Sequence, residues 1–202
     1  MLYSDNRNQP FHHYHFQPYS LRGGNIGGIN LGSSQTILEL VAAAQLNVKI
    51  YEDRISDILK HIDGLTGSSA QGKELRGAVA SLELVMVDIF SVFEARMQHH
   101  FKRGPFSRKL TSLLLKAGET DLADRVHQYY LMINVLKHGK GSSYRELRNA
   151  LSCLFVLKTP EEIISNEEHA PSTLIDASAP SLFSGLAETI IDSYYFLQSR
   201  QV

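Results

Sequence analysis

Three polar side chains near the middle of the chain have the types and spacing of a reactive site. They are His127, Asn134 and His138. At about 100° per residue, an α-helix would place them within about 20–40° of one another around its axis. A histidine that titrates near neutral pH can act as general acid or base on a phosphodiester when nearby cations hold the phosphate. The alternative is that all three are boundary residues beside a buried face.

The cations needed to hold a phosphate follow directly in the sequence. Residues 96–148 carry a net charge of +7, whereas residues 1–95 carry −3 and residues 149–202 carry −5. Such a local basic excess attracts phosphates, unless the middle segment pairs with the acidic ends. Lys137 and His138 could also serve only as helix C-cap charges. The candidate phosphate-binding residues around the stripe are His127, Lys137, Lys140, Arg145 and Arg148.

A second basic group precedes this one. Arg96 and His100, with Lys102 and Arg103 beyond them, could form a phosphate-contact patch. The competing interpretation is a solvated helix end, since Gly104 and Pro105 stop the helix there. Both interpretations place these side chains on the surface.

Two long helices are expected to position these groups. Thr36 and Glu39 form a capping box, and a heptad seam over about 28 residues follows it. Gly64 and Gly67 end this first helix. A second helix begins after residues 68–72 and is apolar on more than one side. The two seams consist of Ile37, Val41, Ala44, Val48, Tyr51, Ile55, Ile58, Ile62 and Leu65, and of Leu75, Ala78, Leu82, Val85, Ile89 and Val92.

Shorter helices are predicted at 106–117, 120–138, about 142–151 and 181–199. With the long pair they predict an all-α helical bundle: two long antiparallel helices and shorter C-terminal helices. Residues 158–180 read as an acidic loop, and the apolar run 151–157 fits either a helix or a short strand. Residues 1–33, rich in Gly, His and aromatic side chains, predict a flexible arm, and residues 34–202 a single helical domain.

The cellular compartment is predicted from the lack of membrane-spanning and signal-peptide patterns in the sequence. No apolar run reaches the roughly 18 residues needed to cross a bilayer, and residues 1–20 have no signal-peptide core. The single cysteine, Cys153, lies in an apolar run and predicts a buried, inert thiol. A cytoplasmic location without membrane contact is therefore expected.

The segment 133–139 resembles the core motif of HEPN domains, all-α proteins of toxin–antitoxin and defence systems. Many of these are metal-independent ribonucleases, and their motif runs from Arg through a polar residue, often Asn, to His. Asn134 and His138 match the last two, whereas Ile133 stands where the family has Arg. The resemblance spans about residues 75–155. It implies Asn134 and His138 as catalytic residues and a dimer in which two motifs face each other. For cleavage, Arg125, Arg145 or Arg148 would have to replace the missing Arg.

No metal or cofactor is predicted. The chain has no Glu-x-x-His pair, zinc-ligand spacing or dinucleotide fingerprint. Asp57 and His61 lie one turn apart and are the nearest approach to a metal pair.

The sequence supports two hypotheses of function. In the first, a HEPN-like protein binds RNA or nucleotide phosphates, with or without cleaving them. In the second, the chain is a non-catalytic interaction or regulatory subunit of a defence or toxin–antitoxin system. A homodimer fits both.

Overall fold

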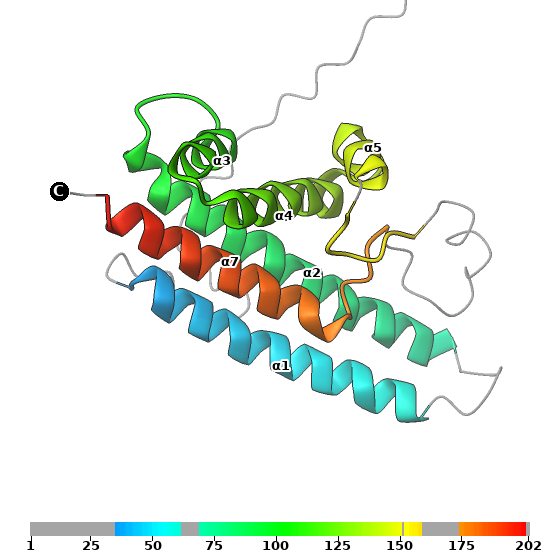
Figure 1. Cartoon of the computed structure of the whole chain (residues 1–202). Helices are drawn as coiled ribbons and strands as arrows, with labels where there is room; N and C mark the ends of the chain where they lie inside the picture. Colours follow the sequence, from blue (N-terminus) through cyan, green and yellow to red (C-terminus); the bar gives the residue numbers. More distant parts are fainter. Residues whose placement is uncertain (1–34, 62–68, 151, 159–173, 201–202) are drawn as a thin grey trace, which may run out of the picture. The chain divides into compact units, whose positions relative to one another are not determined.

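The computed structural model of the chain describes residues 35–61, 69–150, 152–158 and 174–200, and these are mostly helical. They form six α-helices and one short 3₁₀ helix (Figure 1), and they contain no strand. The predicted all-α bundle is thereby confirmed. The predicted arm of residues 1–33 and most of the predicted loop of residues 158–180 lie outside the described ranges.

The two long helices are α1, Ile37–His61, and α2, Ser69–Met97, which pack against each other. The Thr36 backbone N–H donates to Glu39 Oε2 at 2.7 Å, and the Glu39 N–H donates to Thr36 Oγ1 at 3.2 Å, so the predicted capping box starts α1. The first seam points into the core within one chain, since Ile37, Val41, Ala44, Val48, Ile55 and Ile58 are all buried.

Helix α2 is covered on several sides, as predicted, because it contacts α1, α3, α4 and α7. It was expected to continue to Gly104, but the α-helix ends at Met97 and tightens into the 3₁₀ helix η2, Gln98–His100. His99 Nδ1 lies 2.7 Å from the Arg96 carbonyl oxygen, and the Phe101 N–H donates to the Gln98 carbonyl. These local bonds replace the regular helical pattern before Gly104 is reached.

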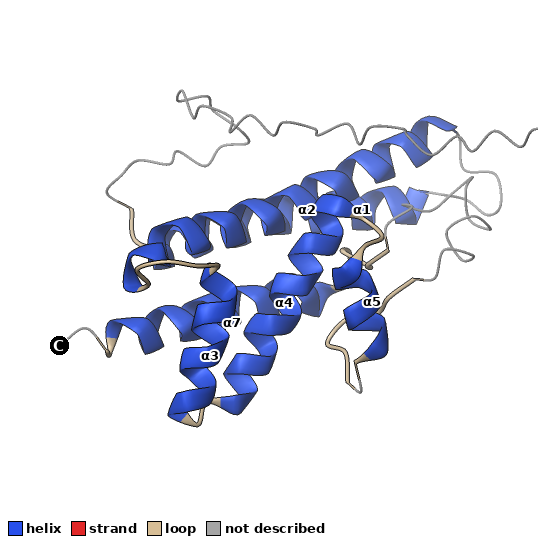
Figure 2. Cartoon of the chain, turned by 90° about the horizontal axis from the view of Figure 1, so that it is seen from above, coloured by secondary structure: helices blue, strands red, loops and turns tan. Residues whose placement is uncertain are grey.

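Helices α3, Phe106–Ala117, and α4, Thr120–His138, form a hairpin that lies across α2 and α7 (Figure 2). Gly118, with φ of 86°, ends α3 in the left-handed conformation that glycine adopts most easily. The buried face of α4 includes the predicted residues Leu122, Val126, Tyr129 and Ile133. This hairpin brings the basic segment of the sequence onto one side of the bundle.

Two shorter stretches complete the fold. Helix α5, Ser142–Asn149, packs on α4, and helix α7, Pro180–Gln198, packs on α1, α2 and α4. Residues 152–158 are neither helix nor strand, with one isolated antiparallel bridge between Leu157 and Ile175.

The predicted buried thiol is wrong, because Cys153 is exposed. Phe155 of this segment is buried, while its neighbours Leu154 and Val156 are exposed. None of the helices in the described ranges is both long and apolar enough to span a membrane.

Candidate functional site

The polar stripe of α4 is present as helix geometry but does not form one site. His127 and His138 are separated by about 16 Å along the helix axis, since eleven residues each rise by about 1.5 Å. The side chain of His127 is 43% exposed, and its Nε2 lies 2.9 Å from Glu146 Oε1 on α5. Asn134 is half-buried and His138 is exposed at the end of α4. One phosphate group therefore cannot contact both histidines.

At the end of α4, the side chains of Asn134 and His138 are available to contact a ligand. They lie one turn, about 6 Å, apart along the axis. Neither makes a side-chain hydrogen bond to any residue in the described ranges. Gly139, with φ of 68°, then redirects the chain toward α5. Lys140 and Arg145, both exposed, follow this turn closely in the sequence.

The position that the family fills with Arg belongs to the core. Ile133 is 2% exposed and lies among the largest fully buried side chains. An arginine there would have to bury its charge. The absence of the motif Arg is thus built into the packing of α4.

The Arg125 side chain is used in contacts within the fold. Its Nη2 donates to Asp192 Oδ2 at 2.9 Å, its Nη1 to Thr189 Oγ1 at 3.3 Å, and its Nε to Asp121 Oδ2 at 3.1 Å. Asp192 and Thr189 belong to α7, so this guanidinium joins α4 to α7. Of the three arginines that could replace the missing one, Arg145 and Arg148 are the exposed ones.

Three further residues from the predicted set already have partners. Lys137 Nζ donates to Ser91 Oγ at 2.9 Å, which ties α4 to α2. It also faces Asp88, where burial raises the pKa of the carboxyl and the Lys137 charge opposes that rise. Arg96 Nη1 donates to the carbonyl oxygen of Gln35 beside the start of α1. Burial first, and the neighbouring His99 second, lower the pKa of His100.

The remaining cations of the basic segment are exposed and carry no ion pair to a described carboxylate. Within the described residues, most of the positive charge of the middle segment is therefore exposed and is not paired with an acidic side chain. One group surrounds α3 and the other surrounds α5. They are Lys102, Arg103, Arg108, Lys109 and Lys116, and Lys140, Arg145 and Arg148.

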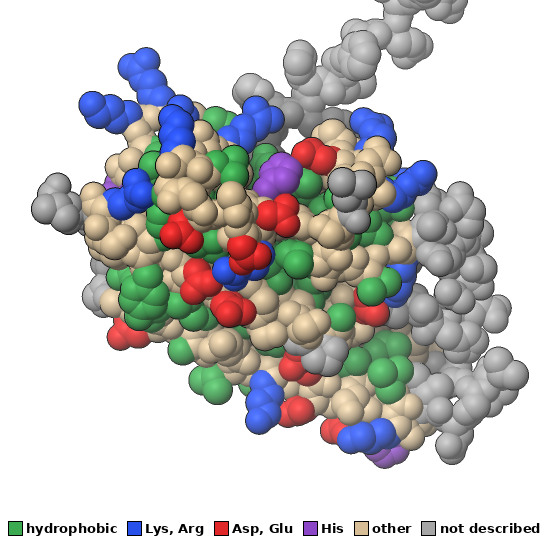
Figure 3. All heavy atoms as spheres, viewed as in Figure 1, with side chains coloured by type: hydrophobic (Ala, Val, Ile, Leu, Met, Phe, Trp, Pro, Cys, Tyr) green, Lys and Arg blue, Asp and Glu red, His purple; other side chains and the backbone are tan. Residues whose placement is uncertain are grey.

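Charged side chains are unevenly distributed over the face shown in Figure 3. Lys and Arg side chains gather over α3 and over α5, and a histidine side chain is exposed between them. Acidic side chains gather over α4 and α7 on the adjoining part of this face. The exposed acidic residues of these two helices include Asp121, Asp124 and Glu188. A polyanion would therefore be attracted to the α3 and α5 side and repelled from the α4 and α7 side.

An open groove of about 450 Å³ lies between α3 and α4 inside the basic area. Its α3 wall consists of Arg108, Thr111, Ser112, Leu115 and Lys116, and His127 reaches it from α4. The groove is absent from the sequence-based prediction, apart from His127. The spacing of the α3 residues at i, i+3, i+4, i+7 and i+8 marks one helix face, but only the hairpin places that face beside His127.

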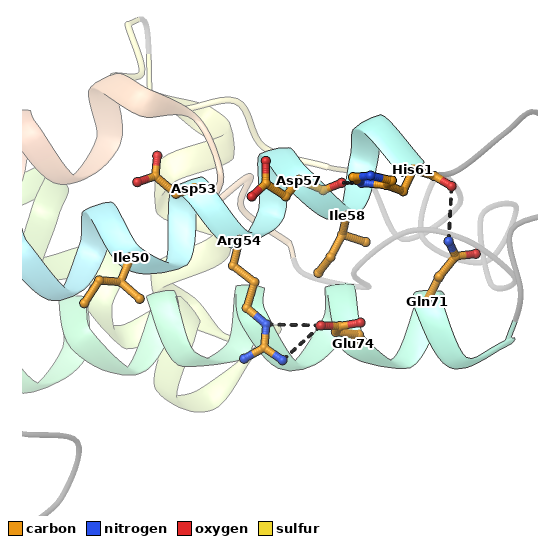
Figure 4. Close-up of a pocket in the computed structure, with 8 residues that line it drawn as sticks. All are labelled: Ile50, Asp53, Arg54, Asp57, Ile58, His61, Gln71 and Glu74. Carbon is orange, nitrogen blue, oxygen red and sulfur yellow. Dashed lines mark hydrogen bonds and ion pairs between the residues drawn. The ribbon is translucent and has the colours of Figure 1, made fainter.

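Asp57 and His61, the nearest approach to a metal pair, line a shallow pocket between α1 and α2 (Figure 4). His61 Nδ1 lies 2.6 Å from the Asp57 carbonyl oxygen, and Arg54 pairs with Glu74 at 3.0 Å across the helices. No cluster of three metal-ligating side chains occurs among the residues that the structure describes. This pocket is a charge-paired helix contact.

Comparison of the chain with protein-family models, with curated proteins and with solved structures found no match. The resemblance to HEPN domains therefore remains a prediction from the residues of α4.

Proposed function

We propose that the chain binds RNA or nucleotide phosphates through the exposed cations around α3 and α5. The observation that carries this proposal is the set of eight lysines and arginines without a described carboxylate partner. Like charges left unpaired on one face repel one another, and a polyanionic partner would neutralise that charge. The adjoining acidic area over α4 and α7 would repel that partner, so the partner would bind on the α3 and α5 side.

The second part of the proposal is the cleavage of RNA by residues at the end of α4. His138 would take a proton from the ribose 2′-hydroxyl as this oxygen attacks phosphorus, and the 5′-oxygen would leave and take a proton from water. Asn134 would hold a phosphate oxygen. Because Ile133 is buried, the stabilising cation would come from Arg145 or Arg148. A second copy of the chain, as in HEPN dimers, would add a second His138.

RNA binding is tested by fluorescence anisotropy of a labelled single strand at several salt concentrations. The variant Lys140→Ala/Arg145→Ala/Arg148→Ala should weaken binding about tenfold or more and flatten the salt dependence by close to three phosphate contacts. The control is Lys73→Ala/Arg76→Ala, which removes two exposed cations from α2, outside the proposed surface. Equal losses in both variants, or salt-independent binding, would overturn the proposal.

Cleavage is tested separately with His138→Ala. This side chain is exposed, so the variant should keep the fold and the RNA affinity while losing cleavage in the presence of EDTA. Cleavage that survives His138→Ala would remove His138 from the mechanism. Binding without cleavage in the wild-type protein would leave a non-catalytic RNA-binding protein.

A second candidate is a non-catalytic interaction subunit, such as a defence or toxin–antitoxin component. It is favoured by the exposed apolar side chains of α1, Leu46, Ile50 and Leu59, of which Leu46 and Ile50 lie one turn apart on one face. The heptad seams no longer argue for a partner, because they are used inside the chain. Light scattering on wild type and on Leu46→Glu/Ile50→Glu tests a homodimer through this face. A complex that is unchanged by these charges would exclude that face as the interface.

A further inference from the structure

The groove between α3 and α4 has a chemistry of its own within the basic area. Arg108 and Lys116 lie two turns apart on one face of α3, and Thr111 and Ser112 lie between them. Two exposed cations therefore flank two hydroxyl groups, each of which can donate to a phosphate oxygen. His127 closes the groove from α4, and its contact with Glu146 engages Nε2 and leaves Nδ1 as the other polar atom of the ring.

We infer that this groove is the subsite for a terminal phosphate of the bound RNA or nucleotide, which rests on the phosphate binding proposed above. A terminal monoester carries a charge near −2 at neutral pH, whereas each internal diester carries −1. Two cations in one groove, Arg108 and Lys116, match the monoester. Lys109, the neighbouring exposed cation, does not line the groove.

The change of surface charge beside the groove favours an end over a passing strand. Asp121 and Asp124 are exposed on α4 within two turns of His127. A strand continuing past the groove in that direction would meet acidic side chains over α4 and α7 (Figure 3), and like charges repel there. The end of a chain avoids this repulsion, since nothing follows the terminal phosphate.

The groove also offers a surface for the sugar or base that carries the phosphate. Leu115, an exposed apolar side chain, lies on its wall between Ser112 and Lys116. Apolar walls combined with a few directed polar groups are typical of nucleotide-sized sites, and a volume of about 450 Å³ falls in their range. The class of ligand is therefore a phosphate-terminated nucleotide or oligonucleotide.

The test compares one RNA sequence with three ends: no terminal phosphate, a 5′-phosphate and a 3′-phosphate. In anisotropy at fixed salt, one of the phosphorylated ends should bind the wild-type protein at least about fivefold more tightly than the unphosphorylated strand. Arg108→Ala/Lys116→Ala should abolish this ratio. The charge-matched control Lys102→Ala/Lys109→Ala removes two exposed cations outside the groove and should weaken all three strands alike, keeping the ratio.

The outcomes separate this inference from the function on which it rests. Salt-dependent binding with the same affinity for all three ends would overturn the terminal-phosphate site and leave RNA binding intact. A ratio that survives Arg108→Ala/Lys116→Ala would also overturn it. If no strand binds, the proposed function fails, and titration with inorganic phosphate followed by NMR signals of Arg108 and His127 then decides the groove alone. Saturable shifts in wild type, lost in Thr111→Val/Ser112→Ala, would support it, and linear shifts would overturn it.

Discussion

His127 Nε2 lies 2.9 Å from Glu146 Oε1, a contact that joins α4 to α5. The two residues lie on either side of a glycine turn, so the contact links α5 to the hairpin of α3 and α4. The contact also gives His127 surroundings that differ from those of His138 on the same helix. His127 faces the groove and its partner on α5, while His138 stands at the far end of the helix.

This ion pair should contribute little to stability. The two side chains are 43% and 54% exposed, and pairs in such positions contribute about 0–1 kcal/mol because water screens them. A double-mutant cycle with His127→Ala and Glu146→Ala, measured by urea denaturation, should therefore give a coupling energy below about 1 kcal/mol. A coupling of several kcal/mol would show that the pair holds α5 in place.

Local signals in the sequence predicted most of the helices. The capping box of Thr36 and Glu39 located the start of α1, and Gly118 located the end of α3. The prediction was wrong at the end of α2, where bonds around His99 stop the helix early. It was also wrong at Cys153, because an apolar run was taken as buried, whereas Phe155 is the one buried residue among 152–158.

The candidate site was predicted only in part, because its contacts cross between helices. Helix periodicity placed His127, Asn134 and His138 on one side of α4. It could not show that Glu146 binds His127 or that Ser91 binds Lys137. The groove depends on how α3 packs against α4, and no spacing within one helix reports that packing.

Arg125 should be a stability residue. Its side chain is only 22% exposed and bonds Asp192 and Thr189 on α7. Arg125→Ala leaves these partners without their donor and should lower the free energy of unfolding by about 2 kcal/mol, since hydrogen bonds to charged groups contribute about 1.5–3 kcal/mol. For a chain of this size that lowers the Tm by about 4–8 °C.

Circular dichroism during heating measures this loss. The control is Arg145→Ala, which removes an exposed arginine without a described partner and should change stability by less than about 0.5 kcal/mol. Equal Tm values for the two variants would contradict the role of Arg125 between α4 and α7.

Gly185 allows α7 to approach Tyr129 of α4. A Cβ atom added at Gly185 would overlap the Tyr129 hydroxyl oxygen. Gly185→Ala should therefore destabilise the fold by about 1–3 kcal/mol, as overpacking does. Tyr129→Phe removes the hydroxyl and its bond to the Leu182 carbonyl at 3.4 Å, so Gly185→Ala should cost much less in that background.

Gly77 of α2 provides the control for this comparison. A Cβ atom there meets nothing within 4 Å, so Gly77→Ala should stabilise the helix by about 0.5–1 kcal/mol. Urea denaturation of the single and double variants measures all three effects. An undiminished cost of Gly185→Ala in the Tyr129→Phe background would place the clash elsewhere.

The same tyrosine should make stability fall at high pH. Burial raises the pKa of Tyr129 to about 12, whereas tyrosine in an unfolded chain has a pKa of about 10. The neutral phenol is thus favoured by folding. Its contribution is fully present below about pH 10 and is lost as the pH rises toward 12. Denaturation between pH 9 and 11.5 should show a steeper loss in wild type than in Tyr129→Phe, and parallel curves would contradict this assignment.

Lys137 should affect stability in a pH-dependent way, which separates it from the exposed cations that have no described partner. Burial raises the pKa of Asp88 above its usual value near 3.8, and the Lys137 charge opposes that rise. A raised carboxyl pKa favours the neutral acid in the fold, so stability is lost as the pH rises through the folded value. Lys137→Met removes the opposing charge and should enlarge that loss.

The variant should therefore be more destabilised at pH 7 than at pH 3, where Asp88 is protonated with or without Lys137. Lys140→Met, which removes an exposed cation with no described partner, should behave alike at both pH values. Urea denaturation at the two pH values measures the difference. If Lys137→Met weakens RNA binding but shows the same stability change at pH 3 and pH 7, Lys137 acts on the ligand and not on Asp88.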